Sequence, residues 1–142
     1  MILDTTYFLP LVGIEVDRDL LKAVDKGTVG LSYLDIGLSS ITIFEVQAKA
    51  AKSGLDSEDI YRGINAILKT FDVIPFYIKN IVKVASELRE RFNDYIDCII
   101  MATAINYGGE LATEDEDILS EKIFLKRRYG LKVYSYKDLM KH

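Results

Sequence analysis

Two carboxylates stand on helix faces that are otherwise apolar, and their type and position suit them to chemistry. Asp97 shares a helical face with Met101 and Ala104, and Glu45 follows Ile41 by one turn on an amphipathic segment. A carboxylate on such a face is costly unless it is hydrogen-bonded, ion-paired or bound to a metal. The sequence around the two acids offers no buried Lys or Arg partner, so a bound cation would explain both positions.

Further acids stand at the ends of predicted elements. Asp4 closes a strand-like segment at the start of the chain, Asp94 precedes the helix that carries Asp97, and Asp115 and Asp117 follow a strand at 110–113. Each has a simpler explanation alone, as a turn residue (Asp4), a helix N-cap (Asp94) or part of a solvated loop (Asp115 and Asp117). Together, clustered carboxylates without histidine favour a hard cation, Mg²⁺ or Mn²⁺.

Short apolar strands alternate with amphipathic helices, a pattern that indicates an α/β fold with a parallel sheet covered on both faces. We predict strands at 1–4, 34–38, 71–76, 110–113 and 132–135, and helices at 18–26, 41–52, 57–69, 77–91 and 94–107, followed by a short helix at the end of the chain. Pro75 places the third strand at a sheet edge. Asp17 is the expected N-cap of the first helix. The expected core-facing stripes are Ile41, Phe44 and Ala48 on the second helix and Ile60, Ile64, Ile67 and Leu68 on the third.

The predicted sheet would bring the acids together. In parallel sheets of this kind the ligand crevice lies at the carboxyl ends of the strands. If the first and fourth strands are neighbours, Asp4 and Asp115 flank that crevice. Helices that carry Glu45 and Asp97 can then reach the same place, so that four carboxylates meet there.

Composition narrows the possible functions. A chain of 142 residues with 49% apolar residues is expected to form one domain, and it lacks an apolar run long enough for a membrane span or a leader segment, so we expect a cytoplasmic protein. A single cysteine, Cys98, and a single histidine, His142, exclude disulfide frameworks, cysteine or histidine zinc sites and histidine-dependent triads. The net charge of −4 argues weakly against bulk binding to nucleic acid.

Nucleotide-binding and phosphotransfer functions have little support in the sequence. No glycine-rich phosphate-binding loop is present. Asp4 could in principle be an aspartyl-phosphate nucleophile, but Thr5 and Thr6 follow it without a second acid. No lysine stands at a later strand end to hold a phosphoryl group.

Four short motifs resemble, in order and spacing, those of the PIN-domain nucleases: DTT after the first strand, SSITIFE at the second helix, DCIIMATA in the late helix and LATED at the fourth strand. The chain looks most like small single-domain toxins of the virulence-associated protein C type. The resemblance implies a three-layer α/β/α fold with strand order 3-2-1-4-5. It also implies a pocket for one or two Mg²⁺ or Mn²⁺ ions built from Asp4, Glu45, Asp97 and Asp115, with Asp94 and Asp117 as accessory ligands and Thr5 and Thr113 as supporting residues.

The function implied by this resemblance is metal-dependent hydrolysis of RNA phosphodiester bonds, as the toxin of a toxin-antitoxin pair. An RNA-processing nuclease outside such a pair, or a non-catalytic module that binds RNA or protein, stays open as an alternative. The implied partners are an RNA substrate, a small antitoxin protein and a second copy of the chain, with no membrane.

The densest basic cluster lies just before the last predicted strand. It consists of Lys122, Lys126, Arg127 and Arg128, of which Lys122 and Lys126 share a helical face. We expect this cluster to contact RNA phosphates. The alternative is a solvated helix face without a binding role.

Overall fold

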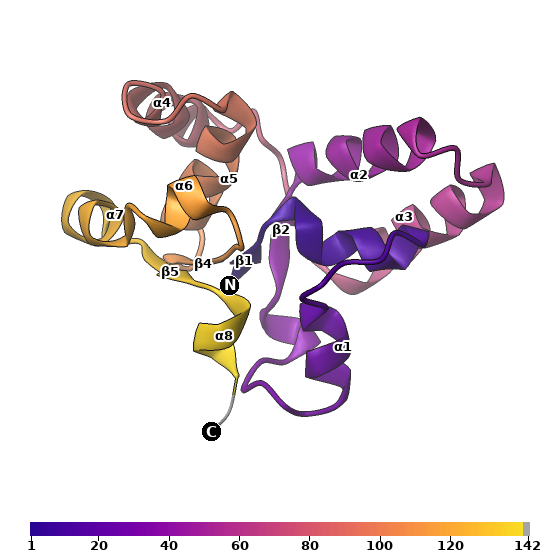
Figure 1. Ribbon diagram of the computed structural model, residues 1–142. Helices are drawn as coiled ribbons and strands as arrows, with labels where there is room; N and C mark the ends of the chain where they lie inside the picture. The colour runs from indigo at the N-terminus through magenta and orange to yellow at the C-terminus, as the bar shows by residue number, and fades with distance from the viewer. Residues whose placement is uncertain (141–142) are drawn as a thin grey trace.

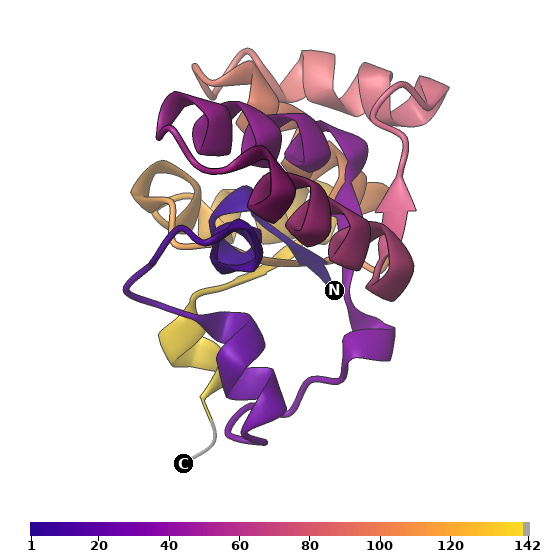
Figure 2. The same cartoon turned by 90° about the vertical axis from the view of Figure 1, so that its right-hand side faces the viewer.

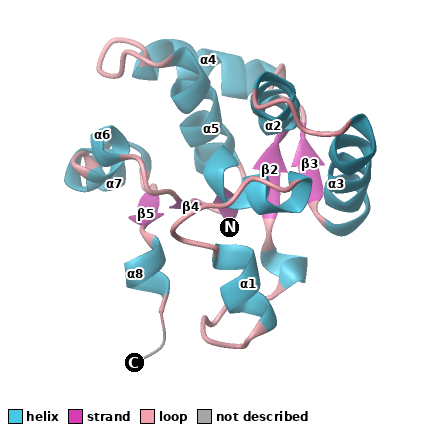
Figure 3. Cartoon of the chain, turned by 45° about the vertical axis from the view of Figure 1, so that its right-hand side comes forward, coloured by secondary structure: helices cyan, strands magenta, loops and turns pink. Residues whose placement is uncertain are grey.

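Five short strands form one parallel sheet at the centre of the computed structural model, which describes residues 1–140 (Figures 1 and 3). The order is β3-β2-β1-β4-β5, and every pairing is parallel. The strands are β1 (Ile2–Leu3), β2 (Gly37–Ser39), β3 (Asp72–Ile74), β4 (Glu110–Ala112) and β5 (Lys132–Tyr134). This order confirms the predicted topology, with β3 at an edge and β1 beside β4.

Helices cover both faces of the sheet, which gives the predicted three layers (Figures 1 and 2). Because successive strand side chains point to opposite faces, Ile2 and Leu111 join one core while Leu3 and Ala112 join the other. The first core contains residues of α4 (Lys79–Leu88), α5 (Tyr95–Asn106) and α7 (Lys122–Tyr129). The second contains residues of the 3-10 helix η1 (Thr5–Val12), α1 (Leu20–Asp25), α2 (Ser40–Lys52) and α3 (Ser57–Thr70).

Helix η1 was not predicted from the sequence. Its residues Tyr7, Phe8 and Leu9 are all buried, so the segment lacks the one-sided pattern by which a surface helix is recognised. The Asp4 side chain caps its start by accepting a hydrogen bond from the backbone N–H of Thr5. Helix α3 lies directly against it, because a Cβ at Gly63 would come within 2.3 Å of the backbone oxygen of Leu11.

The predicted buried stripe of α2 was wrong for Phe44 and Ala48, whereas Ile41 is partly buried and packs against the first core as predicted. Thr42, Val46 and Ala50 face the core, whereas Phe44 is 63% exposed and Ala48 is also exposed. Thr42 is turned inward because its hydroxyl contacts that of Thr5 on η1, and Val46 and Ala50 follow it at four-residue spacing.

On α3 the prediction for Leu68 was also wrong, since its side chain is 54% exposed. The close approach at Gly63 turns that face of the helix toward η1, and Ile67, one turn later, is fully buried. Leu68, the next residue, is rotated away from the core. Ile60 and Ile64 are partly buried and pack against the second core, as predicted.

Several element boundaries differ from the prediction. Asp19, not Asp17, caps α1 by accepting from the backbone N–H of Lys22. The expected strand at 34–38 begins instead with a 3-10 turn, η2 (Tyr33–Asp35), because Ser32 caps it by accepting from the N–H of Leu34, and β2 starts only at Gly37. The expected helix at 77–91 is shorter, since α4 ends at Leu88.

The end of the chain contains two short helices, α6 (Glu116–Leu119) and α8 (Tyr136–Leu139). Helix α8 matches the short final helix expected from the sequence, whereas α6 was not predicted. His142 lies outside the described residues. Within residues 1–140, no helix combines the length and apolar content that crossing a membrane requires.

Candidate active site

A pocket of about 260 Å³ lies at the carboxyl ends of β1 and β4, where the crevice of a parallel sheet is expected. It is lined by Asp4, Thr5, Thr6, Glu45, Lys49, Asp94, Asp97, Glu114 and Asp115. The structure therefore brings together the four acids predicted to form the centre of the site, together with Asp94 and Thr5. Asp117 is exposed on α6 and does not line the pocket. Sequence analysis missed Thr6, Lys49 and Glu114.

Asp4 is the most buried acid of the pocket and is held by two hydrogen bonds. Its Oδ1 accepts from the backbone N–H of Thr5 at 2.8 Å, and its Oδ2 accepts from the hydroxyl of Thr113 at 2.6 Å. Burial raises the pKa of Asp4, and these two bonds oppose that rise without cancelling it. Thr113 Oγ1 also accepts from the backbone N–H of Asp115 at 3.0 Å, so one hydroxyl positions acids on both strands.

Glu45 approaches from α2 and is held by Thr5. The hydroxyl of Thr5 donates to Glu45 Oε1 and lies 3.1 Å from the hydroxyl of Thr42. Ser39 begins this helix by accepting from the N–H of Ile41, which fixes where Glu45 reaches the pocket. The second hydroxyl of the site, that of Thr5, thus joins the end of β1 to α2.

Asp97 is surrounded by the other carboxylates of the pocket. Burial, followed by the charges of Asp4, Asp94, Asp115 and Glu45, raises the pKa of Asp97 to about 7. Among residues 1–140 no Lys or Arg forms an ion pair with any acid of the pocket. The carboxylate of Asp97 also accepts no hydrogen bond from the described residues, although its place in the first turn of α5 favours a negative charge there.

Asp94 and Asp115 each cap a helix at the rim of the pocket. Asp94 Oδ1 accepts from the backbone N–H groups of Ile96 and Asp97 at the start of α5. Asp115 Oδ1 accepts from the backbone N–H of Ile118 at the start of α6. Each therefore has one carboxylate oxygen engaged in capping. Asp94 is both the N-cap that its position suggested and a residue that lines the pocket.

The sequence indicated no buried Lys or Arg partner for Glu45 and Asp97, but one lysine, Lys49, does line the pocket. It stands one turn after Glu45 on α2 and lines the pocket, although it is exposed and forms no ion pair with the described acids. Its four-residue spacing from Glu45 was the signal available in the sequence.

The carboxylates of the pocket are the type of ligand that Mg²⁺ or Mn²⁺ prefers, but they are not arranged around a common point in this structure. All the charged donors of the pocket are carboxylates, and their mutual repulsion lacks compensation, which is what a hard cation would supply. Within residues 1–140, however, no three His, Cys, Asp or Glu side chains are arranged to hold an ion. Hydrogen bonds from the protein engage both oxygens of Asp4 and one oxygen each of Glu45 and Asp115. Binding an ion would require some of these carboxylates to turn.

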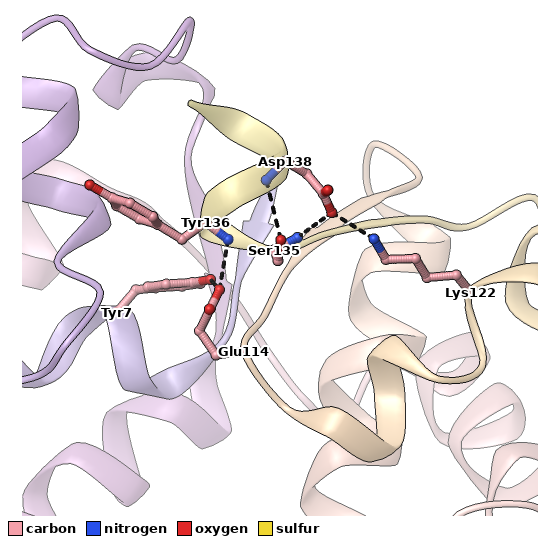
Figure 4. Close-up of polar contacts among 6 residues, drawn as sticks. All are labelled: Tyr7, Glu114, Lys122, Ser135, Tyr136 and Asp138. Carbon is pink, nitrogen blue, oxygen red and sulfur yellow. Dashed lines mark hydrogen bonds and ion pairs between the residues drawn. The ribbon is translucent and has the colours of Figure 1, made fainter. Parts of the chain in front are cut away.

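Glu114 lines the pocket but points its carboxylate toward the C-terminal part of the chain (Figure 4). Its Oε2 accepts from the hydroxyl of buried Tyr7 on η1 and from the backbone N–H of Tyr136 at 2.7 Å. Burial, followed by the bond to Glu114, raises the pKa of Tyr7, so its hydroxyl keeps its proton. This contact fixes the loop between Thr113 and Asp115 against η1 and α8.

Comparison with known proteins identifies the family. A family model described as PIN domain matches residues 1–123. The chain belongs to the PIN domain family. This confirms the resemblance seen in the sequence motifs, and the matched residues of this PIN domain include every acid of the pocket. No curated protein sequence matches the chain.

Solved structures share the fold of this PIN domain over nearly its whole length. FitAcB from Neisseria gonorrhoeae matches with 22% identity and a TM-score of 0.68, covering 97% of this chain and 99% of that chain. A toxin-antitoxin complex from Klebsiella pneumoniae matches with 26% identity and a TM-score of 0.61, covering 82% and 88%. VapBC2 from Rickettsia felis, bound to a DNA fragment from their promoter, matches with 20% identity and a TM-score of 0.63, covering 94% and 96%.

Proposed function

We propose that this PIN domain is a metal-dependent endoribonuclease that hydrolyses RNA phosphodiester bonds and serves as the toxin of a toxin-antitoxin pair. The observation that carries the proposal is the convergence of Asp4, Glu45, Asp97 and Asp115 from separate elements on one pocket without an ion-paired cation. Membership of the PIN domain family and the fold shared with toxin-antitoxin complexes support it.

The residues of the pocket divide the work of the reaction. Mg²⁺ or Mn²⁺, held by Asp4, Glu45, Asp97 and Asp115, would supply stabilisation of the negative charge that builds on the phosphate. Thr113 and Thr5 orient the carboxylates of Asp4 and Glu45 through their hydroxyl groups. Asp97 is the acid least engaged by the protein, so we assign it the additional role of accepting the proton of the attacking water at a carboxylate oxygen.

Cleavage assays on purified protein test this function. RNA should be cleaved in the presence of Mg²⁺ or Mn²⁺, and cleavage should stop when EDTA is added. Asp97→Asn should abolish it, whereas Asp56→Asn, an exposed helix cap far from the pocket in sequence and absent from its lining, should leave it unchanged. Cleavage that persists in EDTA, or a metal-loaded parent that cleaves no RNA, would contradict the proposal.

The same proposal includes a small antitoxin protein and a second copy of the chain as partners. Its support is that the structural neighbours are toxin-antitoxin complexes, and that several large apolar side chains, among them Phe44, Tyr61 and Tyr77, stay exposed. Sedimentation at high protein concentration should show a dimer. A monomer throughout the concentration range would remove the second copy from the proposal and leave the nuclease activity to be judged by the cleavage assay.

A further inference from the structure

A groove of about 610 Å³ lies beside α7 and is larger than the acidic pocket. We call it the α7 groove and define it by the seven residues that line it, which are Arg91, Ser120, Glu121, Ile123, Phe124, Arg127 and Arg128. Three of these seven side chains are arginines and one is an acid, although the whole chain carries a net charge of −4. The groove therefore concentrates positive charge on a protein that is otherwise acidic.

The structure divides the basic cluster that the sequence presented as one unit. Lys122 is paired within the chain, because its Nζ donates to Asp138 Oδ2 at 2.6 Å. Lys122 and Lys126 line a different hollow, beside β5. Of this cluster, Arg127 and Arg128 line the α7 groove, and neither forms an ion pair within residues 1–140. The guanidinium of Arg128 lies 4.9 Å from the centre of the Tyr129 ring.

A planar guanidinium and an aromatic ring also line the groove. The guanidinium of Arg91 lies 3.8 Å from the centre of the Phe124 ring, and its Nε donates to Glu121 at 2.7 Å. This ion pair neutralises Glu121, the acid that would otherwise repel a phosphate. Ile123 is 70% exposed beside them. An arginine plane, an aromatic ring and arginines outside ion pairs are groups that bind the bases and phosphates of single-stranded nucleic acid.

The groove is connected to the acidic pocket by two short segments. Arg91 precedes Asp94, which lines the pocket, by three residues, a separation of at most about 10 Å. Helix α6 starts after Asp115 in the pocket and ends just before Ser120, which lines the groove. A strand whose scissile phosphate lies in the pocket can therefore enter the groove within a few nucleotides.

We propose that the α7 groove is a subsite for the RNA strand on one side of the cleaved bond, with Arg127 and Arg128 on its phosphates and the Arg91–Phe124 pair against a base. This inference rests on the proposed ribonuclease function, and it assigns the binding of substrate to a surface distinct from the acidic pocket. The pocket without an ion repels phosphate, so the groove supplies the attraction that the pocket lacks.

Binding without cleavage tests the subsite directly. The fluorescence anisotropy of a labelled single-stranded RNA of about 12 nucleotides, a length within the range that single-strand-binding domains cover, is measured in EDTA. The double variant Arg127→Glu/Arg128→Glu is compared with Lys79→Glu/Lys83→Glu, which makes the same charge change on the exposed face of α4. The groove variant should bind at least about tenfold more weakly than the control variant, and its plot of log K against log salt should lose a slope of about 1.4. Equal weakening in both variants would overturn the proposal.

Two further measurements separate this proposal from the proposed function and from protein docking. If the parent cleaves RNA, the groove variant should raise KM for a long RNA at unchanged kcat, and should leave cleavage of a dinucleotide unaffected. A parent that binds RNA through Arg127 and Arg128 but never cleaves it would refute the proposed nuclease function and keep the α7 groove only as an RNA-binding surface. Competition with a polyglutamate peptide is the second measurement. If the peptide displaces the labelled RNA at a concentration tenfold lower than unlabelled RNA needs, the subsite is overturned, because the groove would then be a docking site for an acidic protein segment.

Discussion

The hydroxyl of Thr113, at the end of β4, donates a hydrogen bond of 2.6 Å to Oδ2 of Asp4, at the end of β1. Oγ1 of Thr113 also accepts from the backbone N–H of Asp115. One buried hydroxyl therefore fixes the two acids that flank the crevice, on neighbouring strands whose registers place Leu3 beside Ala112.

Thr113→Val should destabilise the protein by about 1–3 kcal/mol, because valine keeps the shape but leaves a buried carboxylate oxygen without its donor. Thr113→Ser keeps the hydroxyl and should lose much less stability. Urea unfolding followed by circular dichroism measures both variants. Similar losses for Val and Ser would show that the methyl group, and not the hydroxyl, matters at this position.

Asp97→Asn should raise the melting temperature in EDTA while removing the stabilisation that Mn²⁺ gives the parent. The substitution removes the cost of burying a charged carboxylate and the repulsion among the pocket acids, together about 1–2 kcal/mol after discounting for solvent screening. For a chain of this length that corresponds to roughly 3–6 °C. Thermal melts of parent and variant, with EDTA and with Mn²⁺, measure both effects. A large drop in EDTA would instead identify Asp97 as a structural acid with a buried partner.

The pH dependence of stability should carry the same signature. Since the pKa of Asp97 is raised to about 7 in the folded protein, the folded chain holds a proton that the unfolded chain has already released. The stability of the parent in EDTA should therefore fall as pH rises from about 4 to about 7. Asp97→Asn should flatten this decline. Parallel curves for the two proteins would assign the decline to other groups.

Glu114 should affect the proposed binding of metal in the acidic pocket, although its carboxylate points away from that pocket. Glu114→Ala removes the acceptor for Tyr7 and for the N–H of Tyr136, which frees the loop that carries Asp115. We expect Mn²⁺ affinity, measured by calorimetry, to fall about tenfold or more. Glu114→Gln retains an acceptor oxygen and should preserve most of the affinity, and Tyr7→Phe should fall between the two. Equal losses for Ala and Gln would mean that the charge alone is needed.

Asp94→Ala should lower stability by about 1 kcal/mol with or without metal, because its bonds to the N–H groups of Ile96 and Asp97 do not depend on an ion. Asp56→Ala, which removes the cap of α3, is the matched control and should cost a similar amount. A loss at Asp94 that appears only in the presence of Mn²⁺ would point to ligation as its main role.

The sequence predicted those features of the fold that depend on local patterns. Strand and helix alternation predicted the parallel sheet, and acids on apolar faces predicted that Glu45 and Asp97 would share a pocket. The face of α2 was not predicted, because Thr42 takes a core position beside Val46 through its hydroxyl contact with Thr5 and leaves Phe44 outside. The pairing of Tyr7 with Glu114 joins residues 107 positions apart, and such a distant contact leaves no spacing signal in a single sequence.

Gly63, which has no side chain, affects the geometry of the pocket because α3 packs closely against η1 at this residue. A methyl group there would collide with the backbone of Leu11 and with Val12 Cγ1, so η1 would have to move. The other end of η1 is Thr5, which holds Glu45. Gly63→Ala should therefore behave as a temperature-sensitive allele, active when cool and inactive when warm. If the proposed toxin function holds, the growth of cells that produce this variant should therefore depend on temperature.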